Sequence, residues 1–447
     1  MFFPSSAADR LSSLLAEEVV GTHPLQVSLV PIVHQILDEI GFPGIFERFG
    51  GDGGDVEAWK VFEAYIHSRA QVQSPVPVSR LEQWIGATIL PHVLDTPAAK
   101  FNEYRIGRVL EAIGPAARGL WLELVAGAHR VFNFNLDWSV YDVTSMYFEG
   151  EYEVSALARY GYSRDGRPGN KQINLGLNVT GEHGIPLYYS VLPGNTEDSS
   201  TVVENLLQIK KLYKQLGAEG SPEILGDQKM LSAELVQHYT QNKVDFIGCM
   251  GTCGLTKGAI AGVPDALLLQ HPLDYVARRH SNLPEHKRDK ERYYAVRTTI
   301  NVPAHARVPG SVAVAVPCLV VLASGKKRLD PQKRETYLSR VEERLTEISS
   351  HLNGGKYKKK VYAQGQIDKA FARYPAVKGL VAATLSGEDD GLCLAWTRNE
   401  PAIESACSGD GKYVVLFSRA DRPTDEVFRR FTNRLIIGTP RGARAWS

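Results

Sequence analysis

The spacing of apolar residues divides the chain into a helical first part and a mixed second part. From residue 24 to about 130, apolar residues recur every three or four positions, as in amphipathic helices. Gly41 ends the first stripe, which consists of Leu25, Leu29, Ile32, Val33, Ile36 and Ile40. Segments 55–70, 78–94 and 103–131 have the same spacing, and Asp55 is expected to cap the first of them.

Near residue 132 the apolar period changes to two, which predicts β-strands. Alternation runs from Phe132 to Val140 and recurs in 173–179 and 185–191. A helix over 202–216 follows, closed by Gly217, and then come a strand at 223–226, a helix capped by Ser232 and a strand at 244–248. Three antiparallel-type strands followed by helix, strand, helix and strand are the order of a ribonuclease H-like core, an α/β fold whose mixed sheet has helices on both faces.

The pattern after residue 250 is less regular. Strands are expected at 293–302 and 311–323, and a long helix is expected to begin with Asp330 as N-cap and Pro331 at its first position. A last core helix is expected from Asp425 to Ile437. We therefore predict an N-terminal helical, DNA-binding domain (1–130), a first part of the core (131–250), a β-containing insertion with a long helix (251–420) and the start of the last core helix (421–447).

Composition narrows the class of protein. Of 447 residues, 43% are hydrophobic and 23% charged, which is typical of a folded soluble protein. The N-terminus has no secretory pattern and no uncharged apolar run approaches 18 residues, so we expect a cytoplasmic protein without a membrane partner. The five cysteines are expected to be ordinary core thiols, because Cys249 and Cys253 have no second pair at zinc spacing.

Net charge is +1, which neither requires nor excludes a nucleic-acid partner. Two local runs are basic. One contains Arg278, Arg279, Lys287, Arg288, Lys290 and Arg292, and the other contains Lys356, Lys358, Lys359 and Lys360. A solvated surface and a DNA contact both fit such runs.

Two aspartates occupy the positions that a metal site needs. Asp142 lies just past the apolar run that ends at Val140, and Asp227 ends the strand at 223–226. In a ribonuclease H-like core these two strands are neighbours, and carboxylates that converge from neighbouring strands suit Mg²⁺. Each aspartate alone has a second explanation as a turn or cap residue.

Several phrases together resemble the DDE transposases of insertion sequences, in the branch whose last motif is Tyr-x-x-Arg-x-x-x-Glu. They are YDVTSMYFEG (141–150), GYSRDGRPGNKQINLGLNV (161–179), GIPLYYSVLPGNTEDSST (184–201) and GDQKMLSAEL (226–235). The resemblance implies that Asp142 and Asp227 are catalytic metal ligands for two Mg²⁺ or Mn²⁺ ions. It also implies a homodimer that acts on double-stranded DNA, namely the terminal inverted repeats and the target.

The last motif departs from the family. Phe431 takes the tyrosine position, Arg434 the arginine position and Gly438 the position of the third catalytic acid, so that acid is absent. Glu426 on the same helix faces another direction, and the spacing of Glu400 and Glu404 does not suggest a replacement. A frameshift or truncation near residue 437 would explain the change.

Three functions follow from these patterns. The main expectation is a transposase that cleaves element ends and transfers strands, impaired by the missing acid, with Arg434 and the lysines at 356 and 358–360 as DNA contacts. The second is an inactive protein that still binds element ends. The third, an unrelated hydrolase or nucleotide-binding enzyme, lacks a G-x-S-x-G elbow and a complete phosphate loop.

Overall fold

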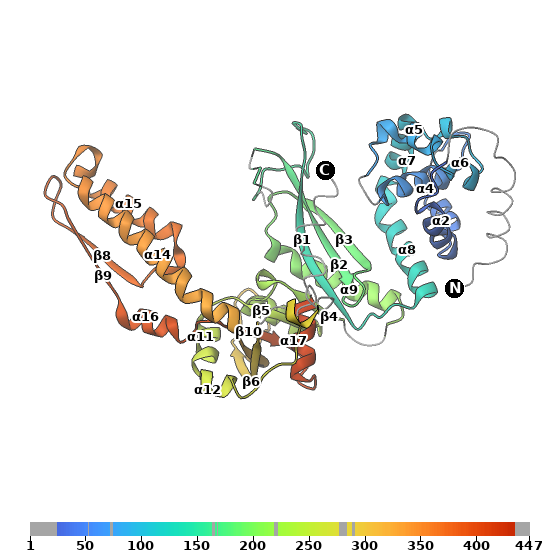
Figure 1. Ribbon diagram of the computed structural model, residues 1–447. Helices are drawn as coiled ribbons and strands as arrows, with labels where there is room; N and C mark the ends of the chain where they lie inside the picture. The colour runs from blue at the N-terminus through green and yellow to red at the C-terminus, as the bar shows by residue number, and fades with distance from the viewer. Residues whose placement is uncertain are drawn as a thin grey trace.

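The computed structural model describes residues 25–51, 53–71, 75–162, 166–167, 169–218, 222–276, 284–287 and 291–433. Figure 1 shows a group of N-terminal helices on one side, a central sheet, and an arm that projects from the sheet on the opposite side. Within these ranges, no helix combines the length and the apolar character that a membrane crossing requires.

The N-terminal helices enclose their own apolar core, as the period of the sequence predicts. Gly41 follows the first helix with φ +77°, in the left-handed region that favours glycine. The helices are α2 (Val30–Glu39), α3 (Phe42–Glu47), α4 (Ala58–Arg69), α5 (Leu81–Gly86), α6 (Leu90–Val93), α7 (Glu103–Ile113) and α8 (Ala117–Phe132).

Helix α2 buries only part of the predicted stripe, of which Val33 and Ile40 pack against the N-terminal core. Ile32 and Ile36 are 54% and 42% exposed, whereas Val30 and Leu37 are buried. Both faces of α2 carry apolar residues, so spacing alone does not select the one that packs on α3 and α4.

The expected cap at Asp55 is also wrong, because α4 begins after Glu57. Asp55 instead forms ion pairs with Lys100 and Arg105, which lower its pKa to about 2. Lys100 and Arg105 lie 45 and 50 residues further along the chain than Asp55, so the local pattern that suggested a cap could not reveal these ion pairs.

The first five strands form the predicted ribonuclease H-like core. They lie in the order β3-β2-β1-β4-β5, with antiparallel pairing among β1, β2 and β3 and parallel pairing of β1 with β4 and of β4 with β5. Their bounds are β1 (Trp138–Tyr147), β2 (Gln172–Thr180), β3 (Pro186–Pro193), β4 (Glu223–Gly226) and β5 (Asp245–Met250).

Helices cover both faces of this sheet, as expected. Helices α9 (Asp198–Gln215) and α10 (Ala233–Gln241) pack on the face that carries Tyr141 and Val143. The two predicted helix-end residues are confirmed: Gly217 has φ +71°, and the Ser232 hydroxyl accepts a hydrogen bond from the Leu235 backbone amide at 3.2 Å. On the opposite face lies α17 (Thr424–Asn433), the last core helix.

The sheet continues past β5 with three strands from the range predicted as an insertion. These are β10 (Lys412–Phe417), β7 (Val314–Ala323) and β6 (Tyr293–Val302), each antiparallel to its neighbours. Two short helices, α11 (Gly254–Ala261) and α12 (Asp265–Leu268), precede them in the chain. The part of 251–420 that leaves the sheet is thus the arm, Ser324–Cys407.

The arm has its own apolar core. It consists of α14 (Ser324–His351), α15 (Lys360–Arg373), β8 (Val381–Ser386), β9 (Cys393–Arg398) and α16 (Glu400–Cys407). Helix α14 continues directly from β7, so the predicted start at Asp330 is wrong and Pro331 lies inside the helix. The Asp330 carboxylate accepts a hydrogen bond from the distant Gly411 amide instead of capping the helix.

The cysteines are free, but only Cys318 is buried. Cys253, Cys393 and Cys407 are exposed and Cys249 is intermediate, so the expectation of core thiols holds for one residue of the five. Burial raises the pKa of the Cys318 thiol to about 12.

A buried ionic cluster fixes α17 on the sheet. Glu223 on β4 has no exposed surface, and its carboxylate accepts hydrogen bonds from Arg422 at 2.8 Å and from Arg430 at 2.7 Å. Both arginines also pair with Glu426. Burial raises the pKa of the Glu223 carboxyl, and the two guanidinium groups oppose that shift. The cluster ties the last core helix to the centre of the sheet.

We expect Glu223→Gln to lower the free energy of unfolding by about 3 kcal/mol, because breaking a buried ion pair leaves uncompensated charge. The control is Glu335→Gln on the arm, where the partner Arg398 keeps Glu342 and the pair is half-exposed, so the cost should stay below about 1 kcal/mol. Urea unfolding measures both. Equal costs would show that the Glu223 cluster does not hold the core together.

Candidate active site

Asp142 lies on β1, and Asp227 directly follows β4, the parallel neighbour of β1. The last register pair of the two strands is Val140 with Leu225, and continuing that register by two residues would place Asp142 opposite Asp227. Side chains at equal register on parallel neighbours point to the same face, with the strands about 4.8 Å apart. The expected adjacency of the two strands is confirmed.

Asp142 differs in one respect from its expected position at a strand end. Strand β1 continues to Tyr147, because its second half pairs with β2, where Asp142 lies opposite Leu177. Asp227 does follow the last residue of β4, Gly226. The pair is therefore bounded by a long antiparallel hairpin on one side and by a strand end on the other.

The surroundings of the two acids are apolar toward the sheet centre. The preceding residues on the same face, Val140 and Leu225, belong to the cluster that packs under α17. Continuing the β4–β5 register by one residue places Cys249 beside Asp227 on this face. Both aspartates are half-buried, so the carboxylates stand at the border between the α17 cluster and open solvent.

The opposite face supports the acids from beneath. The Tyr141 hydroxyl donates to Thr201 Oγ1 at 2.9 Å, and Gly176 on β2 leaves room for this ring, since a Cβ there would lie 2.7 Å from the hydroxyl. At Gly226 a Cβ would lie 2.7 Å from that of Met230, so glycine lets the turn after β4 fold back tightly. These contacts hold the backbone of both aspartates in place.

No third acid joins the pair among the described residues. No group of three or more His, Cys, Asp or Glu residues there has the arrangement of a metal site. Glu426 is engaged by Arg422 and Arg430, while Glu400 and Glu404 lie on α16 in the arm. Gly438, which the sequence predicts at the position of the third acid, and Arg434 lie outside the described residues.

The four lysines predicted as DNA contacts lie together, but away from the aspartates. Lys356 and Lys358 belong to the short 3-10 helix η6 (Gly355–Lys358), Lys359 follows it, and Lys360 begins α15, all at the free end of the arm (Figure 1). Of the other basic run, Lys287 and Arg292 are described, and Arg278, Arg279, Arg288 and Lys290 lie outside the described residues.

Sequence reasoning missed the role of Glu223. A glutamate inside a short, otherwise apolar strand was a usable indication, because a buried carboxylate requires partners. The identity of those partners was not predictable, since Arg422 lies 199 residues further along the chain.

The two aspartates fit one divalent cation. Their carboxylates offer hard oxygen donors, which is the ligand type that Mg²⁺ and Mn²⁺ prefer, and they belong to or follow neighbouring strands. Two carboxylates leave most coordination positions to water and phosphate oxygens, as is common for Mg²⁺ bound with a phosphate substrate.

No protein-family model matches the chain, and comparison with curated proteins finds no match. Among solved structures, the chain is similar to the Mos1 transposase paired-end complex with the left transposon end (13% identity, 42% of this chain, 57% of that chain, TM-score 0.19). It is also similar to the piggyBac transposase synaptic complex with hairpin DNA (11% identity, 66% of this chain, 58% of that chain, TM-score 0.30). The matches thus span 57% and 58% of those chains, and the fold assignment rests on the strand order.

We expect Asp227→Asn to raise the stability of the metal-free protein by about 0.5 kcal/mol, because like charges directly opposite on neighbouring strands repel. The same substitution should abolish stabilisation by added Mg²⁺, measured by thermal unfolding. Asp245→Asn is the control: its carboxylate accepts a hydrogen bond from Ser418 at 2.7 Å, and the Mg²⁺ response should persist. If Asp227→Asn left that response unchanged, Asp227 would not be a metal ligand.

Proposed function

We propose that this chain is a DNA transposase of the DDE type, acting on phosphodiester bonds. The observation that supports the proposal is that β1, which carries Asp142, and β4, which Asp227 follows, are parallel neighbours in a ribonuclease H-like sheet. The phrases around both aspartates that resemble insertion-sequence transposases support it. The family-level function is DNA end cleavage followed by strand transfer.

The chemistry consists of two substitutions at phosphorus. In the first, a water oxygen bonds to phosphorus, the bond to the 3′ oxygen breaks, and that oxygen leaves as a 3′-hydroxyl after taking up a proton. In the second, this hydroxyl loses its proton and bonds to a phosphorus of the target, whose own 3′ oxygen departs. The first step converts a phosphodiester and water into a 5′-phosphate and a 3′-hydroxyl. In the second step one phosphodiester replaces another, and the departing 3′ oxygen takes up a proton in place of the one that the attacking hydroxyl lost, so neither step needs an external energy source.

Asp142 and Asp227 would hold the divalent ions of this reaction. When bound, Mg²⁺ or Mn²⁺ would lower the pKa of the attacking water or hydroxyl group and stabilise the negative charge on the leaving oxygen. The aspartates contribute negative charge and fixed oxygen positions. The hydrogen bond of Tyr141 to Thr201 and the tight turn at Gly226 hold the backbone that carries them. Two ions are expected where three acids are present.

The DNA partners are proposed to be the terminal inverted repeats and the target duplex, bound by a homodimer. Residues 1–130 are proposed as a DNA-binding domain, and the lysines at 356 and 358–360 as backbone contacts. Arg434 is proposed to contact a phosphate near the aspartates.

A second function is favoured by one observation, the glycine at position 438. Without a third carboxylate, a two-metal site loses a ligand and a compensating charge, and the second ion is weakened most. The chain would then bind element ends without cutting them.

We expect release of 3′ ends from labelled inverted-repeat DNA, in Mg²⁺ or Mn²⁺, to be near background for the unmodified chain. Gly438→Glu alone should restore little, because the residues after position 438 still differ from the family sequence and would not hold the new carboxylate in place. Gly438→Glu with a family-like sequence after residue 437 should restore much more.

The controls are Asp142→Ala and Asp227→Ala in the restored protein, and each should return cleavage to background. Binding without any restored cleavage would favour the second function. Strong cleavage by the unmodified chain that vanishes in Asp142→Ala would show that the third acid lies elsewhere.

A further inference from the structure

The arm grows from the same edge of the sheet as the aspartates. Strands β1, β4 and β5 are parallel, β10 is antiparallel to β5, and β7 is antiparallel to β10, so β7 runs in the direction of β1. Helix α14 begins at the residue after β7 ends. The aspartates and the base of the arm therefore lie at the same edge of the sheet, and a duplex that reaches both the aspartates and the tip has to run along the arm.

The base of the arm is fixed to the core by charged side chains. Arg334 forms two hydrogen bonds with Asp410, at 2.6 and 2.7 Å. Asp265 pairs with Lys327 on α14 and, at 2.8 Å, with Lys412 on β10. Five charged residues, two on α14 and three outside the arm, thus hold the first turns of the arm.

The shaft is rigid along its length. Leu338, Val341, Leu345 and Ile348 of α14 are all buried against α15 and the β8–β9 hairpin. Arg398 on β9 forms hydrogen bonds with both Glu335 and Glu342, which lie about two turns apart on α14. A helix braced by a hairpin in this way does not bend freely.

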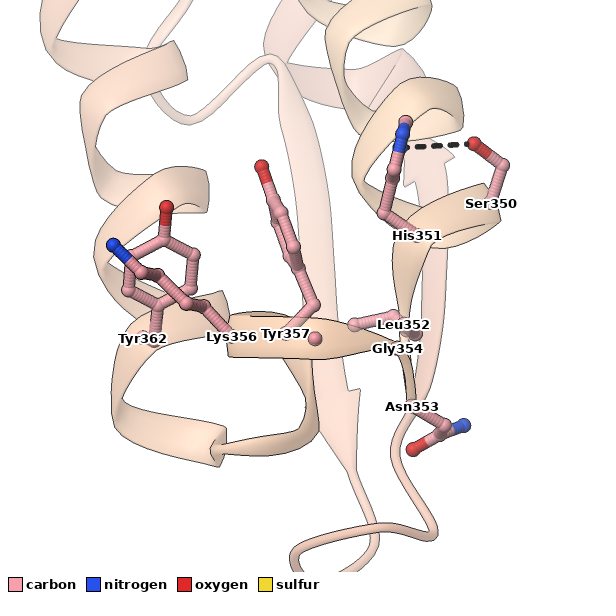
Figure 2. Close-up of a pocket in the computed structure, with 9 residues that line it drawn as sticks. Ser350, His351, Leu352, Asn353, Gly354, Lys356, Tyr357 and Tyr362 are labelled. Atoms are coloured by element: carbon pink, nitrogen blue, oxygen red, sulfur yellow. Dashed lines mark hydrogen bonds between the residues drawn. The ribbon is translucent and has the colours of Figure 1, made fainter.

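The tip is also fixed. Asn353 exchanges two hydrogen bonds with the Leu392 backbone, at 2.8 and 3.0 Å, which ties the end of α14 to the hairpin turn. The Tyr357 ring packs against His351 and, edge to face at 5.1 Å, against Tyr362. Figure 2 shows these three side chains and Lys356 around a shallow hollow.

Two lysines of the tip have charge to offer. Lys358 pairs with Asp390, and Asp389 accepts a hydrogen bond from the Lys360 backbone amide. Lys356 and Lys359 are exposed, and within the described part of the chain no ion pair neutralises them. A rigid tip with two available ammonium groups suits the regularly spaced phosphates of a duplex.

We infer that the arm is a strut whose tip grips duplex DNA about 12 to 16 base pairs from the aspartates, through Lys356 and Lys359. The 28 residues of α14 span about 42 Å at 1.5 Å each. The three strand spacings between β4 and β7 add at most about 14 Å. Division by 3.4 Å per base pair gives the stated range. The inference rests on the proposed function, because it takes the aspartates as the point where DNA is held.

The test is the salt dependence of binding against duplex length. Fluorescently labelled duplexes of arbitrary sequence, of about 8, 12, 16, 20 and 24 base pairs, are titrated with the full chain in Mg²⁺ at several salt concentrations. Once a duplex spans both sites, the slope of log K against log salt should steepen by about 1.8, for two added phosphate contacts at 0.9 each. Between 50 and 200 mM salt this corresponds to about a 12-fold larger loss of affinity.

The variant Lys356→Glu/Lys359→Glu, and the milder Lys356→Gln/Lys359→Gln, should lose the step. The control Lys369→Glu/Lys378→Glu changes the same charge on exposed lysines of the arm away from the tip, and should keep the step. If the steeper salt dependence survives in both tip variants, or does not occur at any duplex length, the arm does not bind DNA through its tip. That result would leave the proposed DNA binding of the chain intact. Failure of every duplex to bind overturns the proposed function itself.

Discussion

The core depends on the hydrogen bonds that two arginines, Arg422 and Arg430, donate to the buried carboxylate of Glu223. Glu223 begins the central strand β4, and Arg422 and Arg430 bring α17 onto that strand from the far end of the chain. An unpaired carboxylate at this position would be too costly to bury, so strand and helix depend on each other. Asp227 stands four residues further along the chain, directly after β4. The ionic cluster thus fixes the sheet on which the aspartates are aligned.

The core was predictable from sequence because its elements have clear periods. Alternation located β2 and β3 to within a residue or two, and the order of elements was sufficient for the strand order. The predictions were wrong where contacts between residues far apart in the sequence determine which face of a helix is buried or where a helix begins. Ile32 was expected inside, but the partner helices leave it exposed on α2; Asp330 was expected to cap α14, but it binds Gly411 from the end of the arm.

The site was predictable in part for the same reason. Asp142 and Asp227 follow apolar strand segments that the fold makes neighbours, so their adjacency follows from element order. Their support could not be predicted, since the pairing of Tyr141 with Thr201 and the close approach of Met230 to Gly226 depend on helix placement. The arm shows the same limit: its lysines were visible as a run, but their distance from the aspartates depends on α14 continuing from β7.

The central claim is that Asp142 and Asp227 together hold a divalent cation. The direct measurement is the anomalous scattering of Mn²⁺ in crystals of the protein grown with the metal. The account predicts a peak bonded to an oxygen of each aspartate, with those oxygens no more than about 4.2 Å apart, as two ligand bonds of about 2.1 Å allow. A peak bound elsewhere, with the two carboxylates more than about 8 Å apart, would contradict it, because no single ion of this kind could then bridge the two aspartates.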